Sequence, residues 1–464
     1  MVPNAESRDV SPSGTGYVAV SVPAPVRLRG NGQRADDSRV SAARLPILLC
    51  DATFSGTLAA VRSLGRAGIP VVVAGSGPVA AAFLSRYTTR HVRCPPVEDA
   101  PAFLQWLLRF GEREGRHVLY PTSDEVVYLL AAHREELSKR FALYQPDLAT
   151  MLGVLDKRKL YDAAGEAGLD APRTWFPESS RDVERAAREA ATPLMIKPRT
   201  QAFLQPHHKG EVGPRDPVLL REVYDRFCSE STYADPVASH MPELTRPMLQ
   251  RFYPQAAESI YSVTGFRDIT GRNLALLGAI KVLQRPRSIG IGLCFESAPL
   301  PEGLFQRVSR FLERIGYYGI FELEFVRDGD RLLLIDMNPR FYHQLALDVA
   351  RGLDLPRLAY AAAIEDADEM AQLVTLAPTG EGAPYSFCNG IGLRVLVGAQ
   401  KLFGTMSPVE AARWREWRHD ARRTLVDSAD ADDDRAPFVA EVLGQVYGFL
   451  RHPRSFVRRI ALDR

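Results

Sequence analysis

Residues 321–340 read FELEFVRDGDRLLLIDMNPR, and this stretch decides the fold. The apolar residues 331–335 are typical of a short buried strand, and an Asp- and Gly-containing turn precedes them. In residues 321–325, bulky apolar side chains alternate with carboxylates. Glu322 and Glu324 therefore share one face of a strand, while the Phe side chains take the other face.

A hairpin that joins these two strands predicts a cluster of oxygen ligands. It brings Glu322 or Glu324 beside Asp336 and Asn338. Carboxylate and amide oxygens, without His or Cys, suit Mg²⁺ that is held partly by substrate phosphates. Arg340 follows at strand spacing, so its guanidinium can lie beside these ligands and contact anionic oxygens. The alternative is an ordinary polar hairpin whose carboxylates lie in solvent.

Length and composition limit the classes of protein. A chain of 464 residues is too long for one ordinary core and indicates about three domains. The 46% hydrophobic and 25% charged residues are typical of a globular protein, and no apolar run is long enough for stable membrane insertion. The net charge of +2 gives no signal for nucleic acid. Five Cys residues without a CxxC pair, and no apolar signal segment, predict a cytoplasmic protein with reduced thiols.

Lysine is scarce in this chain. Of the 58 basic residues only seven are Lys, so the chain uses Arg by default. A compact ammonium is preferred where a phosphate must be reached as a point charge. Lys197 ends the apolar segment 193–197, and a Lys on a buried strand needs an anion. A strand-end Lys that reaches solvent is the alternative.

The first third of the chain alternates strands and helices. Residues 1–44 are rich in Ser, Pro, Gly and Arg and predict a disordered leader. Residues 45–150 have the βαβ pattern of a parallel, doubly wound sheet and predict a small Rossmann-like domain. No GxGxxG follows the first strand, which argues against a dinucleotide site. Polar residues at the carboxyl ends of strands could contact a ligand, with helix capping as the alternative role. They are Thr53, Ser55, Thr122 and Ser123.

The last part of the chain is less distinctive. Residues 344–352 and 358–372 each predict one helix. Residues 373–464 then form a C-terminal extension. It contains an acidic run at 430–434 and a basic amphipathic end at 451–464. A solvated face is favoured over a membrane anchor for that end.

The order of these parts resembles the ATP-grasp superfamily, in its carboxylate–amine ligase branch, with a layout similar to biotin carboxylase and the carbamoyl-phosphate synthase large subunit. The motifs that carry the resemblance are Asp156-Lys157, Ile196-Lys197-Pro198, the segment LQRFYP at 249–254, and the hairpin. The resemblance implies an α/β and α+β multidomain fold. A Rossmann-like pre-ATP-grasp domain at 45–150 would precede a small ATP-grasp subdomain at 151–250 and a large one, with the metal hairpin, at 251–372.

The resemblance also assigns roles to residues. Lys157 and Lys197 would contact ATP phosphates, and Mg²⁺, or Mn²⁺ in its place, would bind to Glu324, Asp336 and Asn338. Glu322 would then be a neighbour of the metal site. The catalytic residues would be Arg340, on the transferring phosphoryl group, and Lys281, near the triphosphate. The nucleotide base and ribose would contact the hinge and the acidic residue after it. These are Gln250, Arg251, Phe252, Tyr253 and Glu258.

Two features depart from the family pattern. The glycine-rich loop that usually follows the second lysine is missing, and residues 199–213 stand in its place. Lys209 or the pair His207-His208 could replace its phosphate contacts, with ordinary surface loop residues as the alternative. The second metal carboxylate is Asp336, one methylene shorter than the usual Glu.

The implied activity is an ATP-dependent ligase that joins a carboxylate to an amine through an acyl phosphate and releases ADP and phosphate. An ATP-grasp kinase and a non-catalytic ATP-binding protein are the alternatives. The implied partners are a small-molecule carboxylate and an amine, with a homodimer left open. Arg285, Arg287 and Arg340 favour an anionic, amino-acid-like substrate.

Overall fold

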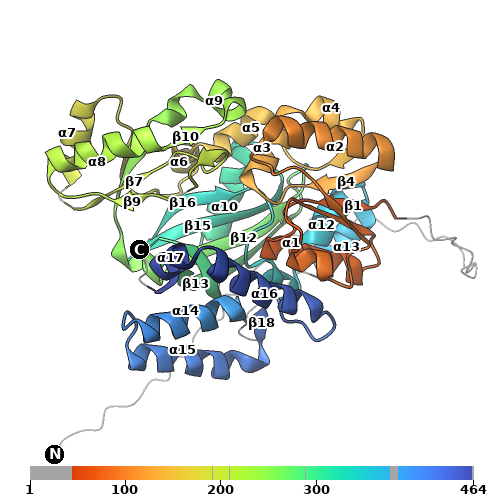
Figure 1. Ribbon diagram of the computed structural model, residues 1–464. Helices are drawn as coiled ribbons and strands as arrows, with labels where there is room; N and C mark the ends of the chain where they lie inside the picture. The colour runs from red at the N-terminus through yellow and green to blue at the C-terminus, as the bar shows by residue number, and fades with distance from the viewer. Residues whose placement is uncertain (1–43, 191, 208, 288, 377–384, 462–464) are drawn as a thin grey trace, which may run out of the picture.

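The computed structural model (Figure 1) describes residues 44–190, 192–207, 209–287, 289–376 and 385–461. Apart from Arg44, the predicted leader lies outside these residues. The described chain forms five-, four- and seven-stranded sheets and one two-stranded ribbon. No helix in the described part of the chain is long and apolar enough to cross a membrane.

The first sheet is parallel, with the strand order β3-β2-β1-β4-β5. Its central strands are apolar runs without alternation, as expected for strands buried on both faces. A parallel sheet within a mixed α/β fold is therefore confirmed. The elements are β1 (Ile47–Leu49), α1 (Ser55–Arg66), β2 (Val71–Gly75), η1 (Ala81–Leu84), β3 (Arg90–Arg93), α2 (Ala100–Glu114), β4 (His117–Tyr120), α3 (Asp124–Ala132), α4 (Arg134–Ser138) and β5 (Phe141–Leu143).

The second sheet has the order β6-β11-β7-β9 and is antiparallel. Helices α7 and α8 pack together on it, and their apolar faces share a core with Ile196 and Leu249. The elements of this region are α5 (Leu148–Leu155), α6 (Lys157–Glu166), β6 (Thr174–Trp175), α7 (Ser180–Ala190), β7 (Leu194–Lys197), β8 (Leu204–Gln205), β9 (Glu211–Val212), α8 (Pro217–Glu230), β10 (Thr232–Tyr233), α9 (Asp235–His240) and β11 (Met248–Arg251).

The central sheet has the order β16-β15-β12-β13-β14-β17-β18, and only its β17–β18 pair is parallel. Its last two strands come from the C-terminal extension, which is therefore built into the sheet. The elements are β12 (Ile260–Arg267), β13 (Leu274–Arg285), β14 (Ile291–Ala298), α10 (Leu304–Arg314), β15 (Gly319–Asp328), β16 (Arg331–Asn338), β17 (Ser386–Cys388) and β18 (Leu425–Asp427).

The remaining helices follow the hairpin. Those near the two large sheets are α11 (Leu345–Ala350), α12 (Leu355–Ala363) and α13 (Ala367–Thr375). Those of the C-terminal segment are α14 (Gly390–Leu402), α15 (Pro408–Asp420), η4 (Ala421–Arg423), α16 (Ala436–Arg451), α17 (Pro453–Phe456) and the π-turn η5 (Val457–Ala461). In Figure 1, α14 and α15 form the lower part of the molecule.

Two predicted helices differ from the observed ones. The single helix predicted over residues 358–372 is wrong, because Glu365 has φ 60° and Asp366 caps a new helix by accepting from Glu369 N. The break separates α12 from α13. The basic end of the chain forms α17 and η5 as far as Ala461, and residues 462–464 lie outside the described residues.

Asp434, in the acidic run 430–434, holds the C-terminal segment on the first sheet and its helices (residues 44–143), which we call the first unit. Asp434 and Arg62 form an ion pair of 2.9 Å, with side-chain exposures of 1% and 7%. The Asp434 carboxylate also accepts from Ser85 Oγ at 2.7 Å and from Arg86 N at 2.9 Å. Helix α1 is thereby connected to the loop that follows β18.

Candidate functional site

The hairpin of β15 and β16 has the predicted strands and turn. In its register Glu322 faces Asn338 and Glu324 faces Asp336, and Gly329 makes the turn with φ 63°. The apolar side chains of residues 321, 323 and 325 lie on the other face and are fully buried. The predicted cross-strand pairing is confirmed, and it gathers three carboxylates and one amide on one face.

Two buried lysines contact the hairpin carboxylates. Lys281, on β13, donates to Glu324 Oε1 at 2.6 Å. Lys157, at the first position of α6, donates to Asp336 Oδ1 at 2.7 Å. The Lys157 side chain is 6% exposed and that of Lys281 is 4% exposed, so both ammonium groups are withdrawn from water. Asp336 and Glu324 are thereby each balanced by one lysine.

Lys197 ends β7 beside these pairs and lacks a carboxylate partner in the described residues. Its ammonium donates to Gln250 Oε1 at 3.4 Å. Gln250 is itself fixed by donating to Tyr161 and to Thr174, each at 3.1 Å. Burial, together with the charge of Lys157, lowers the pKa of Lys197 to about 8. A buried cation held by a neutral amide is suited to accept an anionic ligand.

The other end of the hairpin joins the first unit. Arg340 forms an ion pair of 2.6 Å with Asp124, the first residue of α3, and donates to Asn338 Oδ1 at 2.9 Å. Asn338 in turn donates to Glu322 at 2.9 Å. Gln344 also donates to Glu322, and burial, followed by the charge of Glu324, raises the Glu322 pKa to about 7.

One cavity of about 250 Å³ collects these groups. Its lining includes every predicted site residue except Glu258. The Glu258 side chain is half exposed and pairs with Arg287 and Arg413 at 3.8 and 3.9 Å, so the geometry gives its predicted ribose contact no support. The predicted residues in the lining are Lys157, Lys197, Gln250, Arg251, Phe252, Tyr253, Lys281, Glu324, Asp336, Asn338 and Arg340.

The segment 199–213, which stands where a glycine-rich loop was expected, contributes a lysine to the cavity. Residues 199–213 contain the short strands β8 and β9, and Lys209 lines the cavity from this segment. Lys209 donates to Gly290 O at 3.3 Å, and burial lowers its pKa. Its ammonium is thus a fourth lysine that faces the same space.

A smaller cavity of about 210 Å³ adjoins the first, because Phe54, Ile291 and His343 line both. In the described part of the chain, Arg285 Nη1 and His343 Nε2 are buried without a hydrogen-bond partner, and both residues line this smaller cavity. Ser55 Oγ lies 2.6 Å from His343 Nδ1. Ser55 is therefore not a helix cap, whereas Ser123 does cap α3 by accepting from Val126 N.

Sequence patterns did not identify three residues of the site. Asp124, His343 and Gln344 contact site groups across the fold, from loops or helix ends. The pair of Ser55 and His343 is separated by 288 residues, and that of Arg340 and Asp124 by 216. The only available signal was that Asp124 follows a strand end in a parallel sheet, where such sheets bind ligands.

The hairpin residues fit a magnesium ion. In the described residues no group of three or more His, Cys, Asp and Glu side chains forms a metal cage. The facing pair of Glu324 and Asp336 nevertheless offers hard oxygen ligands, with the Asn338 amide one pair further along. Mg²⁺ commonly takes one or two carboxylates and completes its shell with water and substrate phosphates. The donor set therefore matches an ion that arrives with a nucleotide.

Comparison with known proteins gives one curated relative and several similar structures. No family model matches the sequence. A D-aspartate ligase of Enterococcus faecium is 21% identical over 279 residues. The match covers 57% of this chain and 63% of the relative, so the chain spans less than two thirds of that enzyme's length.

The similar structures share the arrangement of the sheets. The biotin carboxylase domain of Hydrogenobacter thermophilus 2-oxoglutarate carboxylase, in complex with MgADP, has a TM-score of 0.55 at 16% identity and covers 69% of this chain and 70% of its own. An ADP complex of N5-carboxyaminoimidazole ribonucleotide synthetase has a TM-score of 0.52 at 13% identity, with coverages of 78% and 88%. These proteins and the D-aspartate ligase belong to the carboxylate–amine ligase branch of the ATP-grasp superfamily. The chain therefore shares the fold of these ATP-grasp structures, as its sequence predicted.

Proposed function

We propose that the chain is an ATP-dependent ligase that joins a carboxylate to an amine through an acyl phosphate and releases ADP and phosphate. One observation carries the proposal. Three buried lysines, 157, 197 and 281, face the hairpin carboxylates across one cavity. Such a set of charges suits phosphoryl transfer, in which the protein chiefly positions groups and neutralises charge. The ADP ligands of both structural neighbours, and the ligase activity of the relative, support this reading.

The charges in the cavity suggest how the nucleotide binds. Lys157 and Lys197 would contact ATP phosphates, while Glu324, Asp336 and Asn338 would hold Mg²⁺, which neutralises phosphate charge when bound. In the structure, Asp336 and Glu324 are each balanced by a lysine, 157 and 281 respectively. With a nucleotide, those lysines would exchange carboxylate for phosphate partners. The base would lie against the hinge residues 250–253, which line the same cavity.

The reaction needs two steps. In the first, an oxygen of the substrate carboxylate attacks the γ-phosphorus, the bond to the β-phosphate oxygen breaks, and ADP leaves. Arg340 lies beside Asn338, where it would neutralise the transferring phosphoryl group, and Lys281 would do so from β13. In the second step, the amine attacks the acyl carbon, phosphate leaves with the bonding electrons, and the nitrogen loses a proton.

The smaller cavity is suited to the amine substrate. Ser55 Oγ donates to the carbonyl oxygen of His343 at 3.1 Å and also contacts Nδ1 of the same residue. A serine hydroxyl has one proton, and with that proton on the bond to the carbonyl oxygen, Nδ1 carries the proton of the second bond. His343 Nε2 is then an acceptor, and burial, with the charge of Arg285, lowers the His343 pKa to about 4 and keeps the ring neutral. This nitrogen would accept a hydrogen bond from the amine and orient it, while Arg285 would bind a substrate carboxylate.

The test is a screen of ADP release over paired carboxylates and amines with Mg²⁺, followed by mass spectrometry of the products. A pair that raises ADP release and yields an amide supports the proposal. We expect Glu324→Gln to lower kcat by roughly 10²–10³-fold, as for loss of a preorganised charge contact. Asp330→Asn, in the exposed hairpin turn, is the matched control and should retain activity. Chelation of divalent ions should abolish ADP release.

Two results would contradict the proposal. A phosphorylated alcohol in place of an amide would assign the chain to the kinases. Nucleotide binding without turnover over the whole screen would indicate a non-catalytic ATP-binding protein.

For the smaller cavity, Arg285→Gln should raise the KM of the amino-acid-like substrate about 10-fold, as for loss of a charged hydrogen bond, and leave the KM of ATP unchanged. Equal changes in both would remove Arg285 from the substrate site.

The finer division of the chain follows from this function. Residues 45–150 would be the Rossmann-like pre-ATP-grasp domain, which supplies Asp124 and Ser55 to the site. Residues 151–250 and 251–372 would be the two ATP-grasp subdomains that enclose the nucleotide. Lys209 would take the place of the glycine-rich loop.

A further inference from the structure

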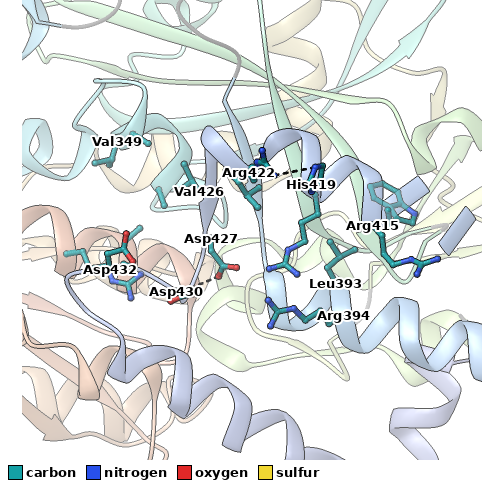
Figure 2. A pocket seen from close by; sticks show the side chains of 18 of the residues that line it. Val349, Leu393, Arg394, Arg415, His419, Arg422, Val426, Asp427, Asp430 and Asp432 are labelled. Carbon is teal, nitrogen blue, oxygen red and sulfur yellow. Dashed lines mark hydrogen bonds between the residues drawn. The ribbon is translucent and has the colours of Figure 1, made fainter. Parts of the chain in front are cut away.

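A second, larger cavity lies at the junction of the C-terminal segment with the first unit. It has a volume of about 1070 Å³ and contains none of the hairpin residues. Its walls come from α1, α11, α14, α15, η4, β18 and the loop that follows β18. Figure 2 shows the basic residues Arg394, Arg415, His419 and Arg422 on one side of the space and Asp430 and Asp432 on the other.

The basic wall is built by the spacing of two helices. Residues 393, 394, 397 and 398 of α14 line the cavity, and residues 414, 415, 418 and 419 of α15 line it at the same spacing. Each set forms one face of its helix. These faces contribute Arg394, Arg415 and Arg418, and η4 adds Arg422.

These four arginines are not balanced by the protein. None of them forms an ion pair with a carboxylate of the described residues, whereas Arg62 and Arg66 on the opposite wall pair with Asp434 and Asp433. Two of the three carboxylates that line the cavity have local partners. Asp427 accepts from the backbone of residues 429 and 430, and Asp432 pairs with Arg435 at 3.1 Å. Arg394, Arg415 and Arg422 are exposed and Arg418 is half-buried, so the wall presents its positive charge to solvent. A cleft lined by charges of one sign raises the local concentration of the opposite ion, here an anion.

Two further donors of this wall lack acceptors. In the described part of the chain, Arg418 Nε and Trp414 Nε1 are buried without a hydrogen-bond partner. A buried donor without an acceptor costs free energy. An anion that accepts from Arg418 Nε together with one Nη of the same planar fork would remove this cost for Arg418.

Apolar side chains also line the cavity. Leu393, Val397, Val349 and Val426 line the space together with alanines of α1 and α11. Small-molecule sites commonly have volumes of roughly 300–1,000 Å³ and combine apolar walls with a few polar groups. The cavity therefore has room for an organic molecule as well as for its charged groups.

We propose that this cavity is a second ligand site, which binds a small organic anion with two or more phosphate or carboxylate groups. Planar guanidinium forks bind both groups in bidentate fashion, and Arg394, Arg415 and Arg418 supply three of them on one wall. The site is separate from the proposed catalytic cavity. It contacts α11, and the turn before α11 carries Gln344, which donates to Glu322 of the hairpin.

The test is calorimetric titration of the full chain with pyrophosphate and, separately, with citrate. We expect a binding event that persists in Lys197→Met, because that variant weakens only the binding of the anion in the catalytic cavity. In Arg415→Gln/Arg418→Gln the dissociation constant should rise at least about 10-fold, as for the loss of charged hydrogen bonds. The matched control is Arg423→Gln/Arg454→Gln, which removes the same charge from exposed positions outside the cavity. The stronger of the two anions shows whether phosphate or carboxylate is preferred.

The outcomes that would overturn the proposal are distinct. Absence of heat with both anions would mean that the cavity binds neither group. Loss of binding in Lys197→Met alone would place the signal at the hairpin. An equal loss of affinity in Arg423→Gln/Arg454→Gln would mean that the anions respond only to the net charge of the chain. Should the double arginine variant not fold, Arg394→Gln provides the same test, because this residue lines the cavity and is exposed enough to be replaced without loss of packing. The thermal unfolding of each variant is the check on folding.

Discussion

Replacing Asp434 by Ala should detach the C-terminal segment from α1. The Asp434 carboxylate is 1% exposed and accepts from Arg62 Nε, Ser85 Oγ and Arg86 N. The substitution leaves the guanidinium of Arg62 buried without its counter-charge. Arg62 also donates to the carbonyls of Ser428 and Ala429, at 3.3 and 2.6 Å.

The size of the effect follows from the burial of the pair. Removal of one partner from a buried ion pair costs about 3–5 kcal/mol, because the remaining charge is uncompensated. The arginine keeps its carbonyl acceptors, so we expect about 3 kcal/mol, at the lower end of that range. Residues 428 and 429 line the smaller cavity beside Arg285. The substitution should therefore also weaken substrate binding there.

Equilibrium urea unfolding followed by tryptophan fluorescence measures this loss. Two of the four Trp residues, 414 and 417, lie in α15 and report the C-terminal segment directly. Asp432→Ala is the matched control, because Asp432 pairs with Arg435 on the exposed surface and such pairs contribute about 0–1 kcal/mol. A loss below about 1 kcal/mol in Asp434→Ala, or an equal loss in the control, would refute the assigned role of the buried pair.

Two further predictions concern positioning and pH. Gln250→Ala removes the acceptor that holds Lys197. Nucleotide binding, measured by calorimetric titration, should therefore weaken about 10-fold, as for the loss of one hydrogen bond to a charged group. The control Gln255→Ala, on the exposed turn after the hinge, should bind nucleotide as the parent does. Hydrogen bonds, first from Arg66 and then from Tyr87, hold the pKa of Asp433 below its ordinary value of about 4. The stability this gives is present above pH 4 and is lost as pH falls, because the unfolded chain then binds more protons. Asp433→Asn should flatten the acid limb of a plot of urea midpoint against pH, and an unchanged limb would contradict the assignment.

The parts of the site that sequence could predict are local. Alternation of apolar and acidic residues in 321–325 defined the two faces of β15, and the turn at Gly329 fixed which residues of β16 lie opposite. Lys197 was identified because a Lys that ends an apolar strand needs an anion. Each of these inferences depends only on residues close together in the chain.

The other parts depend on packing between distant segments. Arg340 was expected beside the metal ligands, but its ion pair with Asp124 requires the first unit to dock on the central sheet. His343 has no motif of its own, and its role arises from Ser55 at the start of α1. The strands β17 and β18 are three residues each, too short for their sequence pattern to reveal that they complete a sheet. Such contacts are set by the whole fold and leave no local periodicity.

The buried pairs of the hairpin give a last prediction, because their presence is not explained by stability. Replacing a buried ion pair by apolar residues of similar volume is often neutral or stabilises a protein by about 1–4 kcal/mol. Lys281 and Glu324 are 4% and 12% exposed, so desolvation opposes their attraction. We therefore expect Lys281→Met/Glu324→Met to unfold at the parent urea concentration or above it, with ADP release lost.

The single variants separate this explanation from a structural one. Lys281→Met leaves Glu324 buried without its partner and should destabilise the chain by about 3–5 kcal/mol. If the double variant were destabilised as much as Lys281→Met, the pair would serve the fold, and its place in the cavity would not argue for catalysis. If the double variant recovers the parent stability but not its activity, the charges are kept for a ligand. The cavity then holds two ion pairs that the fold does not need, together with Lys197, which has no carboxylate partner in the described residues. Such a set of charges is explained by ligand binding and not by stability.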